Sequence, residues 1–136
     1  MDRRTFASIA AFVSLVNGIP GLIAPAAAAS LYGVTLQREG VLSAQLLAGS
    51  YIGYAIINWA TRGISDSAVL RGLDAGNLVG WAVSVVIWTY AGASGLTNAT
   101  AWFGVGLMVL FTVGWAYFVF ADSRTGSRAI TATAPR

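Results

Sequence analysis

The sequence predicts an all-α integral membrane protein, a bundle of four membrane-spanning helices in which neighbouring helices run antiparallel. Of its 136 residues, 57% are hydrophobic and only 10% are charged, whereas soluble domains carry about 25% charged residues. Four apolar stretches approach or exceed the roughly 20 residues that a helix needs to cross a hydrocarbon core of about 30 Å. They cover residues 5–24, 41–60, 68–90 and 99–121. Helices are favoured because these stretches lack the polar alternation of a barrel strand.

The first stretch, residues 5–24, has two interpretations. Arg3 and Arg4, the apolar run and the later Ala27-Ala28-Ala29 resemble a signal peptide with its cleavage site, and cleavage would leave three spans. We favour a retained helix, because the apolar run is longer than the core of about 7 to 15 residues in a typical signal peptide. Pro25 and the alanines after it then form the outer end of this helix or a short interfacial segment.

The later stretches are separated by short connections that contain the helix breakers Gly63, Gly92 and Gly95. Short connections join helices that run in opposite directions. From Asp122 onward the chain is polar and weakly patterned. We therefore expect one transmembrane domain, residues 1–121, followed by a disordered cytoplasmic tail, residues 122–136.

The arginines determine the predicted orientation. If four helices alternate across the membrane, only Arg38, beside Glu39, lies on one side, and the other seven arginines lie on the opposite side. The positive-inside rule places the side with seven arginines in the cytoplasm, together with both chain termini. The expected location is the cell (cytoplasmic or inner) membrane, which the chain crosses several times and where the lipid bilayer is the surrounding partner.

Small residues recur at every fourth position of the third stretch, at Gly72, Gly76, Gly80 and Ser84, and the second stretch contributes Gly49 and Gly53. This spacing lets two helix backbones approach closely in lipid. We expect these residues to pack helices within the chain. The alternative is a seam with a second copy or with a larger membrane partner.

Polar residues follow one face of the third predicted helix. Arg71, Asp74, Asn77 and Trp81 are spaced by three, three and four residues, which places them on one helix face. Tyr51, Tyr54 and Asn58 share a face of the second helix in the same way. Counting inward from the middle loop predicts three facing pairs: Asn58 with Arg71, Tyr54 with Asp74, and Tyr51 with Asn77.

Asp74 is the best candidate for a catalytic or ligand-anchoring group in this polar layer. A charged carboxylate in a span costs about 2.5 kcal/mol or more unless it is paired, protonated or hydrated. We expect Arg71, three residues earlier, to pair with it at the helix surface. The alternative for the whole layer is structural, because polar side chains also hydrogen-bond between helices and hold them together.

Several kinds of chemistry are excluded by composition. The chain has no Cys and no His, which removes thiol chemistry, haem held by His and the usual metal sites, so we expect no metal and no cofactor. All eight basic residues are arginines, so a lysine Schiff base is also excluded. They form no basic patch with interleaved aromatics, and nucleic acid is therefore not an expected partner.

Short motifs recur along nearly the whole chain: Pro25 with 31–34, 44–49 with Gly53, 67–71, 76–80, 95–99 and 116–120. Together they resemble a group of small bacterial four-span membrane proteins that have no assigned activity. The resemblance implies that the first helix is retained, because it precedes the Leu-Tyr-Gly-Val segment in that group.

Three functions fit these observations. The first is binding or processing of a lipid or other small hydrophobic molecule, such as an isoprenoid or quinone, in a pocket around Asp74 that opens to the inner leaflet. The second is a structural or accessory subunit that packs against a membrane partner through its small residues. The third, a small proton-coupled transporter, is disfavoured because the first helix has no carboxylate after Asp2.

Overall fold

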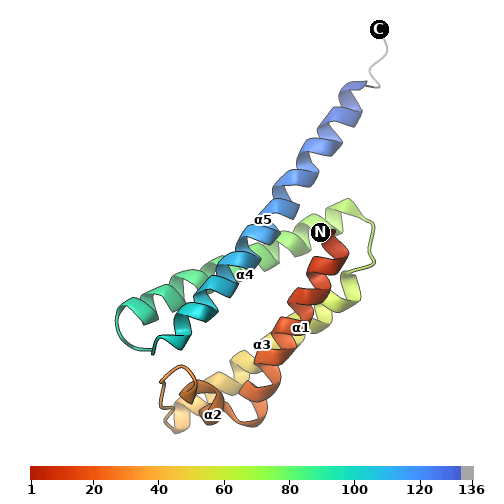
Figure 1. The fold of residues 1–136 in the computed structure, drawn as a ribbon. Coiled ribbons are helices and arrows are strands. Elements are labelled where there is room, and N and C mark those ends of the chain that lie inside the picture. Colours follow the sequence, from red (N-terminus) through yellow and green to blue (C-terminus); the bar gives the residue numbers. More distant parts are fainter. Residues whose placement is uncertain (133–136) are drawn as a thin grey trace.

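The computed structural model describes the backbone of residues 1–132 and the side chains of residues 1–120. This part of the chain is helical and contains no strand (Figure 1). Its five helices are α1 (Arg3–Ile23), α2 (Pro25–Ser30), α3 (Arg38–Thr61), α4 (Ser67–Ala93) and α5 (Thr100–Ala132). Four helical segments are long and apolar enough to cross a membrane: α1, α3, α4 and residues 100–120 of α5. The all-α fold and the four candidate spans are thus confirmed, and α2 is a short separate helix that starts at Pro25.

Two aspartates and a glycine define the helix ends. The Asp2 carboxylate accepts a hydrogen bond from the backbone N–H of Thr5 at 2.7 Å, and this bond lowers the pKa of Asp2. Asp66 caps α4 by accepting from the N–H groups of the two residues after Ser67. Gly95 closes α4 with a φ of +74°, a conformation that residues with a β-carbon rarely adopt.

Helix α5 continues beyond its apolar part. Its backbone is helical as far as Ala132 and projects past the other helices (Figure 1). The segment expected to be a disordered tail thus has a helical backbone as far as Ala132, and the boundary of the transmembrane domain at residue 121 stays a prediction. Helix can continue there because the segment contains no proline before Pro135. The remaining part of the expected tail, residues 133–136, lies outside the described residues.

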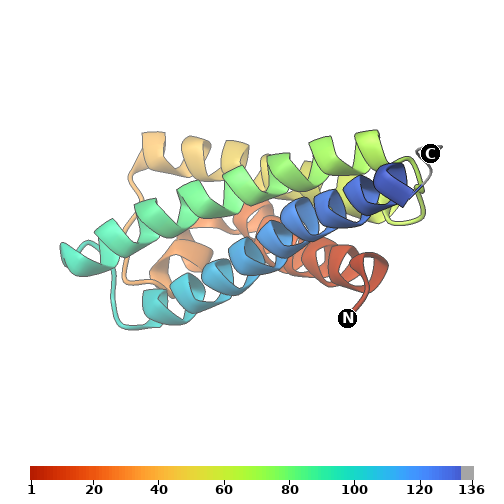
Figure 2. The ribbon, with the colours of Figure 1, turned by 90° about the horizontal axis from the view of Figure 1, so that it is seen from above.

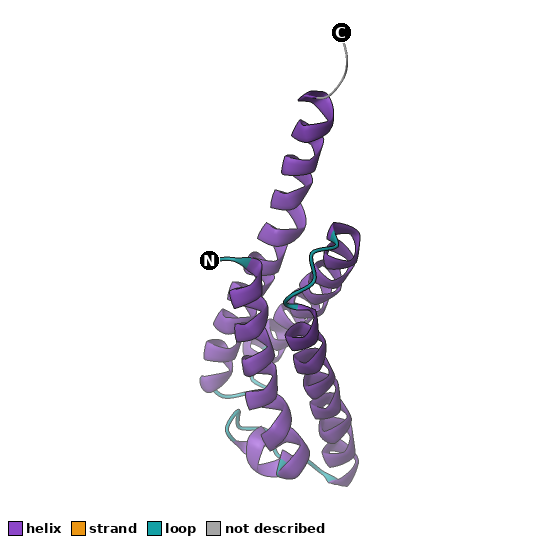
Figure 3. Ribbon diagram, turned by 90° about the vertical axis from the view of Figure 1, so that its right-hand side faces the viewer, coloured by secondary structure: helices purple, strands orange, loops and turns teal. Residues whose placement is uncertain are grey.

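The long helices pack in two pairs, α1 with α3 and α4 with α5. The four lie roughly along a common direction (Figure 2), and the loops gather toward the two ends of the bundle (Figure 3). The α1/α3 contact is close because Gly18 has no side chain. A β-carbon built at Gly18 would lie 2.8 Å from Ile52 Cγ1 and 3.1 Å from the Ala48 carbonyl oxygen.

The core lies where α1 meets α5. Its fully buried members are Phe6, Ala7 and Ala10 of α1 with Phe111 and Trp115 of α5. Beyond this core the helices expose large apolar side chains over most of their length. Examples are Leu46, Val86 and Phe103, which are 70%, 69% and 80% exposed. Such a surface is unfavourable in water and suits hydrocarbon, which indicates a multi-pass membrane protein.

A second set of contacts joins the two helix pairs at the end of the bundle away from the N-terminus. In the α4–α5 loop, the Asn98 backbone N–H donates to the Tyr32 carbonyl at 2.8 Å, and its side-chain amide donates to the Leu31 carbonyl at 3.1 Å. The Tyr32 ring also meets Trp88 edge-on, with centroids 4.9 Å apart. Asn98 thus ties the loop before α3 to the loop before α5.

Candidate functional site

The centre of the polar layer is an ion pair between α1 and α4. Arg3 Nε donates to both carboxylate oxygens of Asp74 at 2.9 Å, and Arg3 Nη2 lies 2.6 Å from Oδ1. The side chains are only 13% and 5% exposed. Asp74 lies two turns inside α4, and Arg3 reaches it from the first turn of α1. The charge of the buried carboxylate is therefore compensated from another helix.

This partner differs from the one expected. Arg71 was predicted to pair with Asp74, but Arg71 is exposed and makes no ion pair in the described part of the chain. The reason is geometric. A pair three residues apart holds both groups on the surface of their own helix, whereas Asp74 faces α1, where the Arg3 guanidinium can approach it in the plane of the carboxylate.

Two asparagines pair between α3 and α4, one turn along α4 from Asp74. Asn58 Nδ2 donates to Asn77 Oδ1 at 3.0 Å, and Asn77 Nδ2 donates back to Asn58 Oδ1 at 3.1 Å. Asn77 also donates to the carbonyl of Leu73 in its own helix. Both asparagines are almost completely buried. Each amide thus satisfies a donor and an acceptor of the other, as burial in lipid requires.

The predicted register between α3 and α4 is therefore wrong by about two turns. Asn58 faces Asn77 and not Arg71, which precedes Asn77 by six residues. Tyr54 correspondingly lies near Gly80 instead of Asp74, since its hydroxyl would be 3.0 Å from a β-carbon built at Gly80. Counting from the helix ends ignored the pairing of amides between helices. This pairing stabilises the observed register, because hydrocarbon offers buried amides no hydrogen-bond partner.

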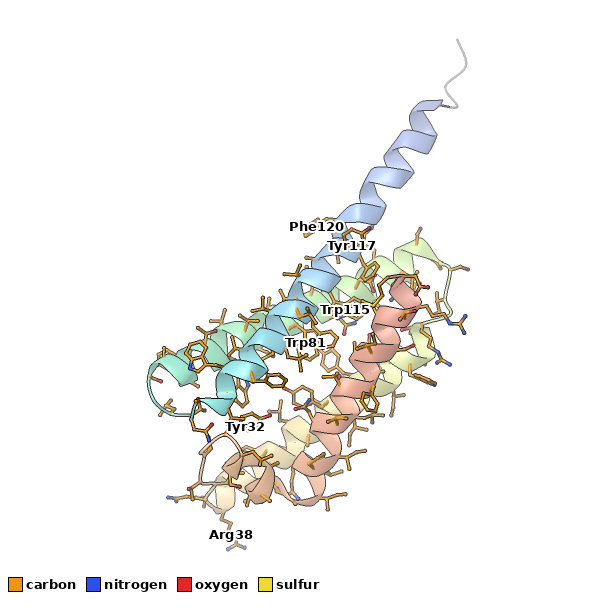
Figure 4. All side chains as sticks on the ribbon, in the orientation of Figure 1. Tyr32, Arg38, Trp81, Trp115, Tyr117 and Phe120 are labelled. Carbon is orange, nitrogen blue, oxygen red and sulfur yellow. The ribbon has the colours of Figure 1, made fainter. Side chains whose placement is uncertain are left out.

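Aromatic rings cover the ion pair from the side of α5. The Arg3 guanidinium lies 5.9 Å from the centroid of Trp115, and Phe6 packs edge-on to the same indole at 5.0 Å. Trp81 stacks on Phe111 with centroids 4.7 Å apart. Figure 4 shows Trp81 and Trp115 between α5 and α1. Trp115 is completely buried, and its indole N–H has no acceptor among the described residues.

The remaining predicted site residues are dispersed. Tyr51 is half-buried, Tyr54 is partly exposed, and Ser84 donates to the Gly80 carbonyl in its own helix. The structure thus brings Asn58, Asp74 and Asn77 together and leaves the other polar candidates outside this group. A shallow depression of about 380 Å³ lies elsewhere, on the first two turns of α3, lined by Arg38, Glu39, Val41, Leu42 and Gln45.

Four of the five glycines predicted to pack helices within the chain need correction. A β-carbon built at Gly49, Gly53, Gly72 or Gly76 would meet no described atom within 4 Å. These positions are open because α3 packs chiefly on α1, and α4 on α5, through other faces. Gly80 does meet another helix as predicted, since a β-carbon there would lie 3.0 Å from the Tyr54 hydroxyl oxygen of α3, and further close contacts form at Gly18, Gly21, Gly92 and Gly114.

The sequence analysis missed Arg3, Phe6 and Trp115 as members of the site. Arg3 was treated only as a flanking charge that sets orientation. One signal could have found it, since the buried residues of α1 repeat at helical spacing from the start of the helix. They are Phe6, Ala7, Ala10, Ala11, Ser14 and Gly18, and Arg3 lies one turn before Ala7 on this face.

The site holds one carboxylate, one guanidinium and two amides. In the part of the chain that the structure describes, no three His, Cys, Asp or Glu side chains come together in a way that could hold a metal ion. Comparison of the chain with family models, with curated proteins and with solved structures finds no match. The fold and the site together define a helical protein of the multi-pass membrane class.

Proposed function

We propose that this chain is a structural or accessory subunit of the cell (cytoplasmic or inner) membrane, where it packs laterally against a second membrane protein or a second copy of itself. The observation that carries this proposal is the state of Asp74. Both of its carboxylate oxygens are engaged by Arg3, so the one buried acid is not free to bind a ligand or move a proton. Asn58 and Asn77 likewise satisfy each other. The polar layer then serves to hold the α1/α3 and α4/α5 pairs together.

The open glycines supply the surface for lateral packing. Gly72 and Gly76 lie on α4, and Gly49 and Gly53 lie on α3, with no described atom near their missing β-carbons. Small residues allow close backbone approach, and they matter in lipid because hydrophobic force does not bring helices together there. Glycines four residues apart, as on α3 and α4, suit the close packing of a helix from a partner.

Substitution of Gly76 tests the proposal. Gly76→Leu adds a side chain into space that is empty in the single chain, so the chain should fold normally while its assembly in the membrane is lost. Gly106→Leu is the matched control, because a β-carbon at Gly106 on α5 also meets nothing within 4 Å. Gly80→Leu is unsuitable, since it would collide with Tyr54.

The measurement is the size of the complex extracted in mild detergent, read on a native gel. The proposal predicts a complex larger than one chain for the unaltered protein and for Gly106→Leu, and a single chain for Gly76→Leu. Finding single chains for all three proteins, or the same complex for all three, would contradict it.

We further propose that neighbouring helices run antiparallel and that both termini face the cytoplasm. The support is the distribution of arginines under the positive-inside rule. The N-terminus and the α3–α4 connection also lie toward the same end of the bundle (Figure 1). Fluorescent-protein and alkaline phosphatase fusions at each terminus test this topology. Fluorescence without phosphatase activity is expected at both termini, and phosphatase activity at either terminus would refute the arrangement.

A second candidate function, binding of a hydrophobic molecule such as an isoprenoid or a quinone, is favoured by one observation. The Trp115 indole N–H is buried beside the ion pair and has no acceptor in the part of the chain that the structure describes. An oxygen of such a molecule could accept its hydrogen bond. Mass spectrometry of the purified protein tests this candidate. Binding would be supported over a structural role if the unaltered protein carries one such molecule per chain. Trp115→Phe should lose that molecule, and Trp102→Phe, a control at an exposed tryptophan, should retain it.

A further inference from the structure

The charged groups at the N-terminal end of the bundle are unequally engaged. Among the described side chains, three carboxylates lie there, and each has a partner within the chain. Asp74 is held by Arg3, Asp2 accepts from the N–H of Thr5, and Asp66 accepts from the first N–H groups of α4. The charges of Asp2 and Asp66 are thus directed toward helix N-termini, which favour negative charge.

Three guanidinium groups at the same end form no ion pair with a described carboxylate. Arg4 lies in the first turn of α1, Arg62 directly follows α3, and Arg71 lies in the second turn of α4, one turn nearer the helix start than Asp74. Arg4 and Arg71 are exposed. The single ion pair among the described side chains is that of Arg3 with Asp74, so none of the three is paired with a carboxylate of residues 1–120.

Arg62 is also held in a fixed orientation. Its guanidinium lies 3.7 Å from the centroid of the Trp59 ring, and its Nη1 donates to the Trp59 carbonyl. The Trp59 indole is 55% exposed and lies in the last turn of an apolar helix, where tryptophan marks the level of the lipid headgroups. One hydrogen bond uses one of five N–H donors, which leaves the other donors free to bind an anion.

We infer that Arg4, Arg62 and Arg71 bind the phosphate groups of anionic phospholipids in the leaflet that this end of the bundle faces. Guanidinium groups match the oxygens of a phosphate with paired hydrogen bonds. The stacked Trp59 places the Arg62 donors at the depth of lipid phosphates, which a soluble anion would not occupy. The opposite end has no such excess, because Arg38 is followed directly by Glu39. Figure 4 shows Arg38 pointing away from the bundle at that end. This inference rests on the membrane location proposed above.

Lipid retention in nanodiscs tests it. The full chain is reconstituted into nanodiscs of phosphatidylcholine mixed with phosphatidylglycerol, then released and examined by native mass spectrometry. The unaltered protein should retain phosphatidylglycerol above its share of the mixture. Each of Arg4→Gln, Arg62→Gln and Arg71→Gln should lower the ratio of retained phosphatidylglycerol to phosphatidylcholine by about fivefold. Arg38→Gln, the matched control, should leave the ratio unchanged.

Two further arms separate the alternatives. Arg62→Lys keeps the positive charge and loses the planar, stacked guanidinium, so it should lower the ratio, whereas an unchanged ratio would overturn the fixed site at Arg62. Added inorganic phosphate should not displace the lipid, and displacement would overturn the assignment to phospholipid. Retention of both lipids in the proportion supplied would overturn the inference while leaving the membrane location intact. A chain that does not enter nanodiscs at all would overturn the location and the inference together.

Discussion

Arg3 and Asp74 are 71 residues apart in the sequence, and the Arg3 Nε lies 2.9 Å from each oxygen of the Asp74 carboxylate. The contact joins the first turn of α1 to a residue two turns inside α4, across the boundary between the two helix pairs. Because the pair is nearly closed to the surroundings, neither charge can lose its partner without a large cost.

The first prediction concerns this ion pair. Arg3→Gln leaves an unpaired carboxylate and Asp74→Asn leaves an unpaired guanidinium, and each should destabilise the fold by about 3–5 kcal/mol. The double variant removes both charges and should be less destabilised than either single variant. The measurement is unfolding by denaturing detergent from mild detergent micelles, followed by circular dichroism. If the two single effects simply add in the double variant, the side chains do not interact as the structure describes.

The second prediction concerns the reciprocal amides. Asn58→Leu removes the partner of a buried amide, and so does Asn77→Leu, and each should cost about 0.6–1.7 kcal/mol in a membrane protein. The double variant should recover part of this loss, because two leucines leave no unpaired polar group at the contact. The same unfolding assay measures all three proteins. If the double variant loses as much stability as the two single variants added together, the amides are not coupled.

The candidate site was predicted in part. Asp74, Asn58 and Asn77 could be selected from the sequence because a polar residue in an apolar stretch is costly and must be buried against a partner. The identity of each partner could not be selected. Arg3 lies far away in the chain, and hydropathy cannot say which helices are neighbours in a bundle. The expectation of Arg71 used only spacing within one helix.

The glycines show the same limit from another direction. Spacing identified Gly72 and Gly76 as small residues on one face of α4, but it could not say whether that face meets a helix of the same chain. The structure leaves both open and uses Gly18 and Gly114 for close contact. Local pattern predicts that a residue can pack closely, and only the arrangement of helices decides where packing occurs.

The third prediction concerns the loop contact at Asn98. Its side-chain amide donates to the Leu31 carbonyl, while its side-chain oxygen accepts from the N–H of Thr100 at the start of α5. Asn98→Asp keeps the acceptor for Thr100 and loses the donor to Leu31. Amide hydrogen exchange in residues 31–36 should therefore become faster in Asn98→Asp, while exchange in the first turn of α5 stays the same. Unchanged exchange in both segments would mean that the tie to Leu31 does not hold the loops together.

The fourth prediction concerns the contact of Gly114 with Phe6. A β-carbon at Gly114 would lie 2.5 Å from Phe6 Cε2 and closer still to Phe6 Cζ, so it would overlap the ring. The ring cannot move aside, because Phe111, Trp115 and Phe118 pack around it with centroids 5.0–5.5 Å away. Gly114→Ala should therefore destabilise the fold by about 1–3 kcal/mol.

Gly106→Ala is the control for Gly114→Ala, because the two glycines share α5 and a β-carbon at Gly106 meets nothing within 4 Å. Alanine favours a helix over glycine by about 1 kcal/mol, so Gly106→Ala should leave the fold as stable or make it more stable. Detergent unfolding of the two variants beside the unaltered chain measures the difference. The packing of α1 on α5 would be refuted if Gly114→Ala gained stability as Gly106→Ala does, since helix propensity alone would then explain both.

Combining Gly114→Ala with Phe6→Leu tests whether the loss of stability comes from the contact with the Phe6 ring. The smaller, flexible leucine can yield to the new β-carbon, so the double variant should lose less stability than the two single losses added together.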